Sequence, residues 1–200
     1  MELQTWLPKM TEFLNLLPAA VFCYLPMKNQ LKYSRLFTFL LCMGLFVFYI
    51  PFSSWLALYL DVDANYVFLP SLIIFFFLYK TTVKTDLSRT LSVYLNACAV
   101  LSFPSMFALM LDARLHPASG AADFSWEAGL FQVVLSAFLV LALSYPLHRH
   151  FSWMLDALDF PKLWYLTVLF PAMIFVFNLI TIPYSYQTLY AGRLMILFPG

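Results

Sequence analysis

The stretch LFTFLLCMGLFVFYIPFSSWLALYL, residues 36–60, decides the fold class, because it contains no charged side chain. A bilayer core about 30 Å thick is crossed by roughly 20 apolar residues in a helix. Barrel strands would be shorter, at roughly 10 residues, and would alternate apolar and polar side chains. This stretch is long and apolar on all sides, so it predicts a membrane-spanning helix.

The composition of the whole chain supports the same reading. The 200 residues are 63% hydrophobic and 10% charged, and the mean hydropathy is +0.83. Globular chains are about 45–50% apolar and about 25% charged. These values exclude a soluble enzyme, a disordered tail, a disulfide scaffold and a collagen-like fibre, and a net charge of +1 gives no basis for nucleic-acid binding. We expect one all-α domain over residues 1–200, a polytopic membrane helix bundle.

Further apolar stretches flank the first one, and together they predict six transmembrane helices. The expected spans are residues 13–25, 36–60, 66–79, 91–111, 128–147 and 163–182. The first is short for a full crossing. The final residues, 193–200, read as the start of a truncated seventh span, which indicates a longer natural protein whose cytoplasmic part is not in this chain.

Charged residues between the spans predict the orientation. The connections after the first, third and fifth spans hold eight of the eleven Lys and Arg residues, whereas the N-terminus and the other connections hold seven of the ten acidic residues. Basic connections stay in the cytoplasm. The pattern therefore predicts an N-terminus outside the cell and a multi-pass protein in the plasma (or inner) membrane.

No catalytic residue, cofactor or metal site is predicted from the motifs. The sequence contains neither H-E-x-x-H nor G-x-S-x-G, and five glycines form no phosphate-binding loop. Cys23, Cys42 and Cys98 each lie in an apolar run without metal-ligand spacing, which favours small core residues. The run His148–His150 after the fifth span is best explained as an interfacial anchor.

Polar residues at or near membrane depth are the candidates for ligand binding. Asn96 and Asn178 lie within spans, and Asp112, Arg114 and His116 begin the longest outer connection. One reading places the two amides inside the bundle and the three charged or titratable residues at its outer rim, around a small polar or peptide signal. Interhelical hydrogen bonds explain the amides equally well, and the connection can simply join two helices.

Three stretches carry a resemblance to a known family: FCYLPMKNQLKYS (22–34), HPASGAADFSWE (116–127) and LDALDFPKLWY (155–165). They resemble the N-terminal transmembrane sensor regions of uncharacterised GHKL-type sensor histidine kinases of gut Firmicutes. The resemblance implies signal input across the membrane, with homodimerisation and kinase activity belonging to a cytoplasmic part. No residue of this chain matches a kinase motif, so no kinase role is assigned to any of them.

A second class of function stays open on the same observations. A small six-helix transport protein, such as the substrate-binding subunit of an energy-coupled vitamin transporter, has a similar length and number of spans. ATP-binding motifs downstream in the reading frame would favour the kinase, and a stop codon near Gly200 would favour the carrier.

Overall fold

The computed structural model describes residues 3–62, 64–116, 125–158 and 160–190, and in these ranges the side chains of 3–5, 65, 161 and 178–190 are outside the description. This part of the chain is helical throughout, apart from turns and one isolated bridge between Leu31 and Val83. The all-α prediction is confirmed. The elements are α1 (Leu3–Leu14), α2 (Leu16–Tyr24), α3 (Arg35–Tyr59), α4 (Ala64–Thr82), α5 (Leu87–Leu115), α6 (Trp126–Pro146), the π-helix η1 (Leu147–Phe151), α7 (Ser152–Ala157) and α8 (Pro161–Tyr190).

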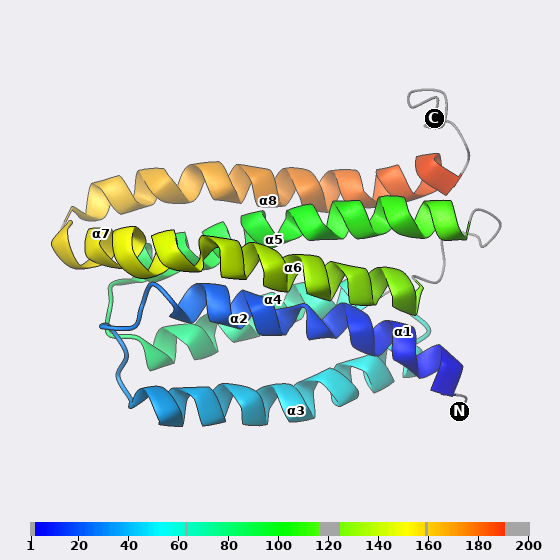
Figure 1. The fold of residues 1–200 in the computed structure, drawn as a ribbon, viewed down its shortest axis with the longest axis horizontal. Helices are drawn as coiled ribbons and strands as arrows, with labels where there is room; N and C mark the ends of the chain where they lie inside the picture. The colour runs from blue at the N-terminus through cyan, green and yellow to red at the C-terminus, as the bar shows by residue number, and fades with distance from the viewer. Residues whose placement is uncertain (1–2, 63, 117–124, 159, 191–200) are drawn as a thin grey trace.

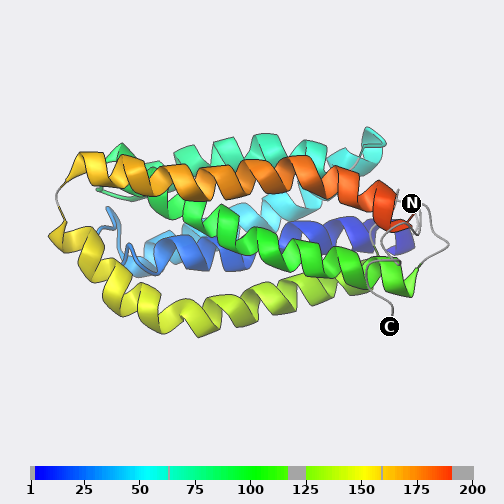
Figure 2. The same cartoon turned by 90° about the horizontal axis from the view of Figure 1, so that it is seen from above.

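The helices lie side by side along one long axis, and the chain reverses direction between α2 and α3, α3 and α4, α4 and α5, α5 and α6, and α7 and α8 (Figure 1). The connection from α2 to α3, the turn from α4 to α5 and the turn from α7 to α8 gather at one end of the bundle. The beginning of α1, the beginnings of α4 and α6 and the end of α8 lie at the other end (Figures 1 and 2). The connections predicted to share a side of the membrane therefore share an end of the molecule.

We call the end that holds the connections from α2 to α3, α4 to α5 and α7 to α8 the basic end. Eight Lys and Arg residues lie there: Lys28, Lys32, Arg35, Lys80, Lys84, Arg89, Arg149 and Lys162.

Three helical stretches are long and apolar enough to cross a membrane: Arg35–Tyr59, Leu87–Leu115 and Trp126–Ala157. Two shorter apolar helical stretches, Tyr66–Thr82 and Lys162–Phe177, correspond to the predicted third and sixth spans. These judgements rest on length and composition over the described residues. The predicted seventh span, residues 193–200, lies outside the described residues.

The helical segment that contains the first predicted span, residues 13–25, begins before it, at Leu3. Polar residues such as Lys9 and Glu12 interrupt the apolar run without interrupting the helix. Together α1 and α2 cover residues 3–24, about 33 Å at 1.5 Å per residue. The break at Asn15 has a local cause: Pro18 has no N–H to donate to the carbonyl of Leu14, and its ring crowds that carbonyl.

The fifth predicted span continues past its expected end at residue 147. Pro146 closes α6, the π-helical turn η1 follows, and α7 carries the rod to Ala157. A proline that removes one backbone donor is a common cause of such a local change in helical pitch. In Figure 2 these three elements form one bent rod along an edge of the bundle. The bend places the run His148–His150 over the basic end.

The central helix is α5, which packs against α2, α4, α6 and α8. Small side chains such as Ala97, Ala99 and Ser92 are buried along it, and small residues let helices approach closely. The Ser92 hydroxyl lies 3.0 Å from that of Thr167, across the contact of α5 with α8. The predicted site residues on α5 therefore lie on the most buried of the described helices.

Candidate functional site

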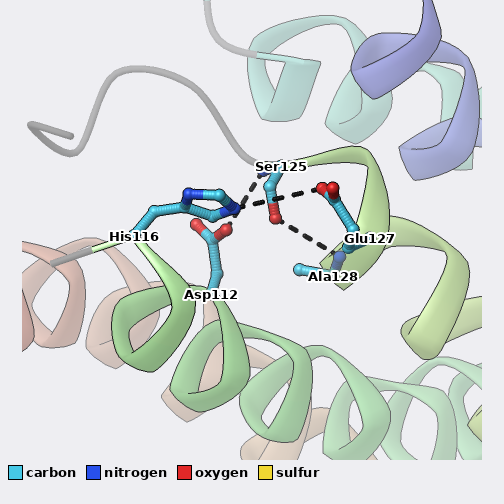
Figure 3. Close-up of polar contacts among 5 residues, drawn as sticks. All are labelled: Asp112, His116, Ser125, Glu127 and Ala128. Carbon is cyan, nitrogen blue, oxygen red and sulfur yellow. Dashed lines mark hydrogen bonds and ion pairs between the residues drawn. The ribbon is translucent and has the colours of Figure 1, made fainter.

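The end of α5 and the start of α6 bring two of the predicted rim residues together (Figure 3). Asp112 is 1% exposed, and a carboxylate oxygen accepts a hydrogen bond of 3.2 Å from the backbone N–H of Ser125. Ser125 in turn caps α6, since its hydroxyl accepts from the N–H of Ala128 at 3.3 Å. Negative charge at a helix N-terminus is favourable. Asp112 thus fixes the start of α6 against the end of α5.

His116 and Glu127 face each other beside this contact, with 4.0 Å between Nε2 and Oε2. Both side chains are about two-fifths exposed, at 43% and 41%, and the pair is ionic only when the imidazole is protonated. Exposed pairs of this kind contribute about 0–1 kcal/mol. The contact is accessible to solvent and adds little to stability.

Arg114 lies between these two residues in the sequence but is exposed, unlike Asp112. Residues two apart on a helix do not share a face. Its position in the last turn of α5 suits a cation at the negative end of the helix dipole. Of the three predicted rim residues, Asp112 and His116 therefore meet the start of α6, and Arg114 faces outward.

The predicted interior amides do not join this cluster. Asn96 precedes Asp112 on α5 by about 24 Å at 1.5 Å per residue. Its Nδ2 donates to the carbonyl of Ser92 at 2.8 Å, within the same helix. Asn178 lies in α8, and its side chain is outside the described residues. A small ligand at the Asp112–His116 cluster would not reach Asn96. A ligand site that involves all five residues stays a prediction.

A pocket that the sequence did not indicate lies between α2, α3, α4 and α5. It is open on one side, and the space free of protein atoms is about 640 Å³ when the open solvent at its mouth is included. The lining comes from residues 16–24, 41–46, 72–79 and 94–98, which cover the length of α2 and, in α3, α4 and α5, lie mostly nearer the basic end.

All three cysteines of the chain, Cys23, Cys42 and Cys98, line this pocket as free thiols. Each comes from a different helix, so sequence spacing gave no sign that they converge. Among the described residues no group of three or more His, Cys, Asp or Glu is arranged to hold a metal ion. Here the thiols act as small, weakly polar wall residues.

Three tyrosines also line the pocket, but their hydroxyls are engaged with the protein. Tyr24 shares a hydrogen bond of 2.9 Å with the Thr82 hydroxyl. Tyr79 donates to the carbonyl of Cys23 at 2.9 Å, and Tyr94 donates to the carbonyl of Leu72 at 2.7 Å. The rings pack against one another, and those of Tyr24 and Tyr79 meet edge to face with 5.2 Å between their centroids. The tyrosines brace the helices and present mainly ring surface to the pocket.

The basic end contains a second set of contacts that the sequence did not predict. The Asp156 carboxylate accepts hydrogen bonds from the side-chain amides of Asn29 at 2.9 Å and Gln30 at 2.7 Å. Lys28 reaches η1, where its Nζ lies 3.0 Å from Nε2 of His148 and donates to the His148 carbonyl at 3.1 Å. The sequence reading of His148–His150 as a surface anchor missed this contact, because the partner lies 120 residues away.

Comparison with known proteins adds no relative: no protein-family model, curated protein or solved structure matches the chain.

Proposed function

We propose that this chain is a six-span membrane domain that takes in a signal for a sensor histidine kinase. The proposed spans are α1 with α2, α3, α4, α5, α6 with η1 and α7, and α8, with the basic end in the cytoplasm. The observation that carries the membrane part is the gathering of eight of eleven basic residues at one end of the bundle. Cytoplasmic connections carry such an excess of Lys and Arg.

The outer surface of the bundle supports the same proposal. Large apolar side chains are exposed along the helices, among them Leu36, Phe48, Ile73, Phe138, Leu141, Phe170 and Met173. Soluble monomers rarely expose contiguous apolar patches beyond a few hundred Å². Lipid tails would cover these side chains, since a hydrocarbon environment removes the cost of exposing them to water.

A labelling experiment tests the orientation. In a background without the native cysteines, we expect Arg114→Cys to react with a membrane-impermeant maleimide in intact cells, and Lys84→Cys to react only after permeabilisation. Both positions are exposed, so accessibility on each side of the membrane decides the result. Labelling of Lys84→Cys from outside would reverse the proposed topology.

The signalling part of the proposal rests on the resemblance of residues 22–34, 116–127 and 155–165 to sensor-kinase membrane regions. We expect the coding sequence beyond codon 200 to encode a histidine-bearing helix and an ATP-binding domain. We also expect the purified chain by itself to retain no label from radioactive ATP. A stop codon directly after codon 200 would instead favour the transport protein.

The pocket between α2 and α5 is a specific observation in favour of that second candidate, because a substrate-binding subunit needs a site between its helices. Its wall is mainly apolar, whereas a polar vitamin would need several hydrogen-bonding partners. The apolar wall therefore weakens the case for a polar vitamin as the ligand of this pocket.

A further inference from the structure

The pocket between α2, α3, α4 and α5 has the features of a site for a hydrocarbon chain. We propose that it binds one acyl chain of a bilayer lipid, which enters sideways past the first half of α3. This inference rests on the membrane part of the proposed function, since only a chain embedded in a bilayer meets lipid at this depth.

The small residues of the wall create the space. Ala19, Ala20 and Ala97 line the pocket with the three cysteines, so six of its side chains are alanine or cysteine. Leucine or phenylalanine at these positions would fill the volume, as elsewhere in the bundle. Small side chains of α2, α3 and α5 thus line one common pocket.

The chemistry of the wall selects an apolar ligand. Apart from the cysteines and tyrosines, the lining consists of alanine, leucine and phenylalanine. The three tyrosine hydroxyls are already hydrogen-bonded to protein groups. A polar ligand would lose its hydrogen bonds to water without replacing them, whereas a hydrocarbon chain loses none.

The packing of α3 provides the entrance. Its buried residues are Ile50, Ser53, Ser54 and Ala57 in the second half, but only Thr38 and Phe46 in the first. The pocket-lining residues Leu41, Cys42 and Leu45 lie in that loosely covered first half, and Leu45 is 37% exposed. A lipid chain can therefore reach the pocket from the side.

The placement also fits a lipid of the cytoplasmic leaflet. The lining residues of α3, α4 and α5 lie mostly nearer the basic end, and under the proposed topology that half of the bundle crosses the inner leaflet. Lys32 and Arg35 stand at the start of α3, at the level where a phosphate headgroup would lie.

The test is photocrosslinking of the full chain in vesicles of a phosphatidylcholine with a diazirine in one acyl chain. We expect adducts on residues 16–24, 41–46 and 94–98, in excess of those on the exposed α8 stretch 165–173. Cys42→Phe, which fills the pocket from its open side, should reduce the pocket adducts roughly tenfold, the loss expected when about two methylene groups are displaced. Cys42→Ala, the matched control, should leave them unchanged.

The adducts on α8 distinguish a failure of the lipid site from a failure of the membrane assignment. Adducts on α8 without an excess in the pocket would overturn the lipid site and leave the membrane assignment standing, whereas no adducts on either would contradict the membrane assignment itself. If Cys42→Phe does not fold, Cys98→Leu with Cys98→Ala as its control gives the same comparison from the α5 side. A parallel arm uses free palmitate bearing a diazirine; pocket labelling by the free acid alone would overturn the assignment to a bilayer lipid.

Discussion

The two ends of the bundle are held together by different means. At the basic end, the connection between α2 and α3 is tied to distant segments: Lys32 N–H donates to the Thr82 carbonyl at 2.9 Å, and Lys84 N–H donates to the Gln30 carbonyl at 2.7 Å. At the opposite end, helices meet directly, as where Gly129 of α6 lies against Thr11 of α1, and the Ser125 N–H donates to Asp112 where α5 meets α6. Among the described residues, backbone hydrogen bonds between two connections are thus a feature of the basic end, whereas the opposite end combines close helix contact with one buried carboxylate.

Under the proposed function, the difference between the contacts at the two ends affects how a signal would pass from helix to helix. A bundle whose helices touch closely at one end can transmit a shift of one helix to its neighbours there, because packed interfaces do not deform continuously. At the other end, hydrogen-bonded connections join α2, α4, α5 and α7, so a shift of one of these helices would displace the connections as a unit. Disrupting each end separately will show whether the two kinds of contact differ in strength.

The largest effect should come from Trp164→Ala at the basic end. Trp164 is 1% exposed, its Nε1 donates to the Leu158 carbonyl at 3.1 Å, and its ring packs edge-on to Phe151. We expect a loss of about 3–5 kcal/mol in the free energy of unfolding, because the truncation leaves a cavity and an unpaired carbonyl. SDS-titrated unfolding in detergent micelles, followed by circular dichroism, measures it. Trp153→Ala, on an exposed residue of the same end, is the control and should change the value little.

Gly129→Ala tests the close contact at the opposite end. A Cβ added at Gly129 would lie 2.7 Å from Cβ of Thr11, so α1 must move away from α6. We expect a loss of about 1–3 kcal/mol, typical of overpacking. Gly44→Ala in α3 is the matched control: nothing lies within 4 Å of the new Cβ, and alanine should stabilise that helix by up to about 1 kcal/mol. Equal stability of the two variants would contradict the proposed close contact.

Asp112→Ala should also weaken the opposite end, by about 1–3 kcal/mol, because the N–H of Ser125 loses a buried acceptor. Asp112→Asn keeps an acceptor oxygen and should recover part of the loss. Arg114→Ala, on the exposed side of the same helix end, should unfold like wild type in the same titration. If Asp112→Ala also unfolds like wild type, Asp112 does not hold α5 to α6.

Asp156→Ala should have the smallest effect on stability, about 1 kcal/mol or less, since the side chain is exposed. Its clearer effect should be local: without the hydrogen bonds to Asn29 and Gln30, trypsin should cut faster after Lys28 and Lys32. Limited proteolysis with mass spectrometry measures the rate. Asp86→Ala removes an exposed acid at the same end that forms no capping hydrogen bond; an equal increase there would mean that charge alone controls cleavage.

The sequence by itself determined the helical class, the approximate position of each helix and the alternation of charge between the two ends. Each of these depends on local features of the sequence. Examples are the hydropathy over some 20 residues, a proline, or a serine such as Ser125 that caps the next helix. The helix before the first predicted span was not predicted, because a count of apolar residues does not show that a helix continues through Lys9 and Glu12.

Only the tertiary structure decided which residues meet. Cys23, Cys42 and Cys98 share one pocket, Asp156 holds a connection more than 120 residues away, and Asp112 is buried at a helix junction while Asn96 bonds within its own helix. These outcomes depend on how far each helix is rotated and shifted along its neighbours. Since the apolar helices have little contrast between their faces, their own composition specifies neither the rotation nor the depth, and the mutual fit of small side chains, prolines and connections does so instead.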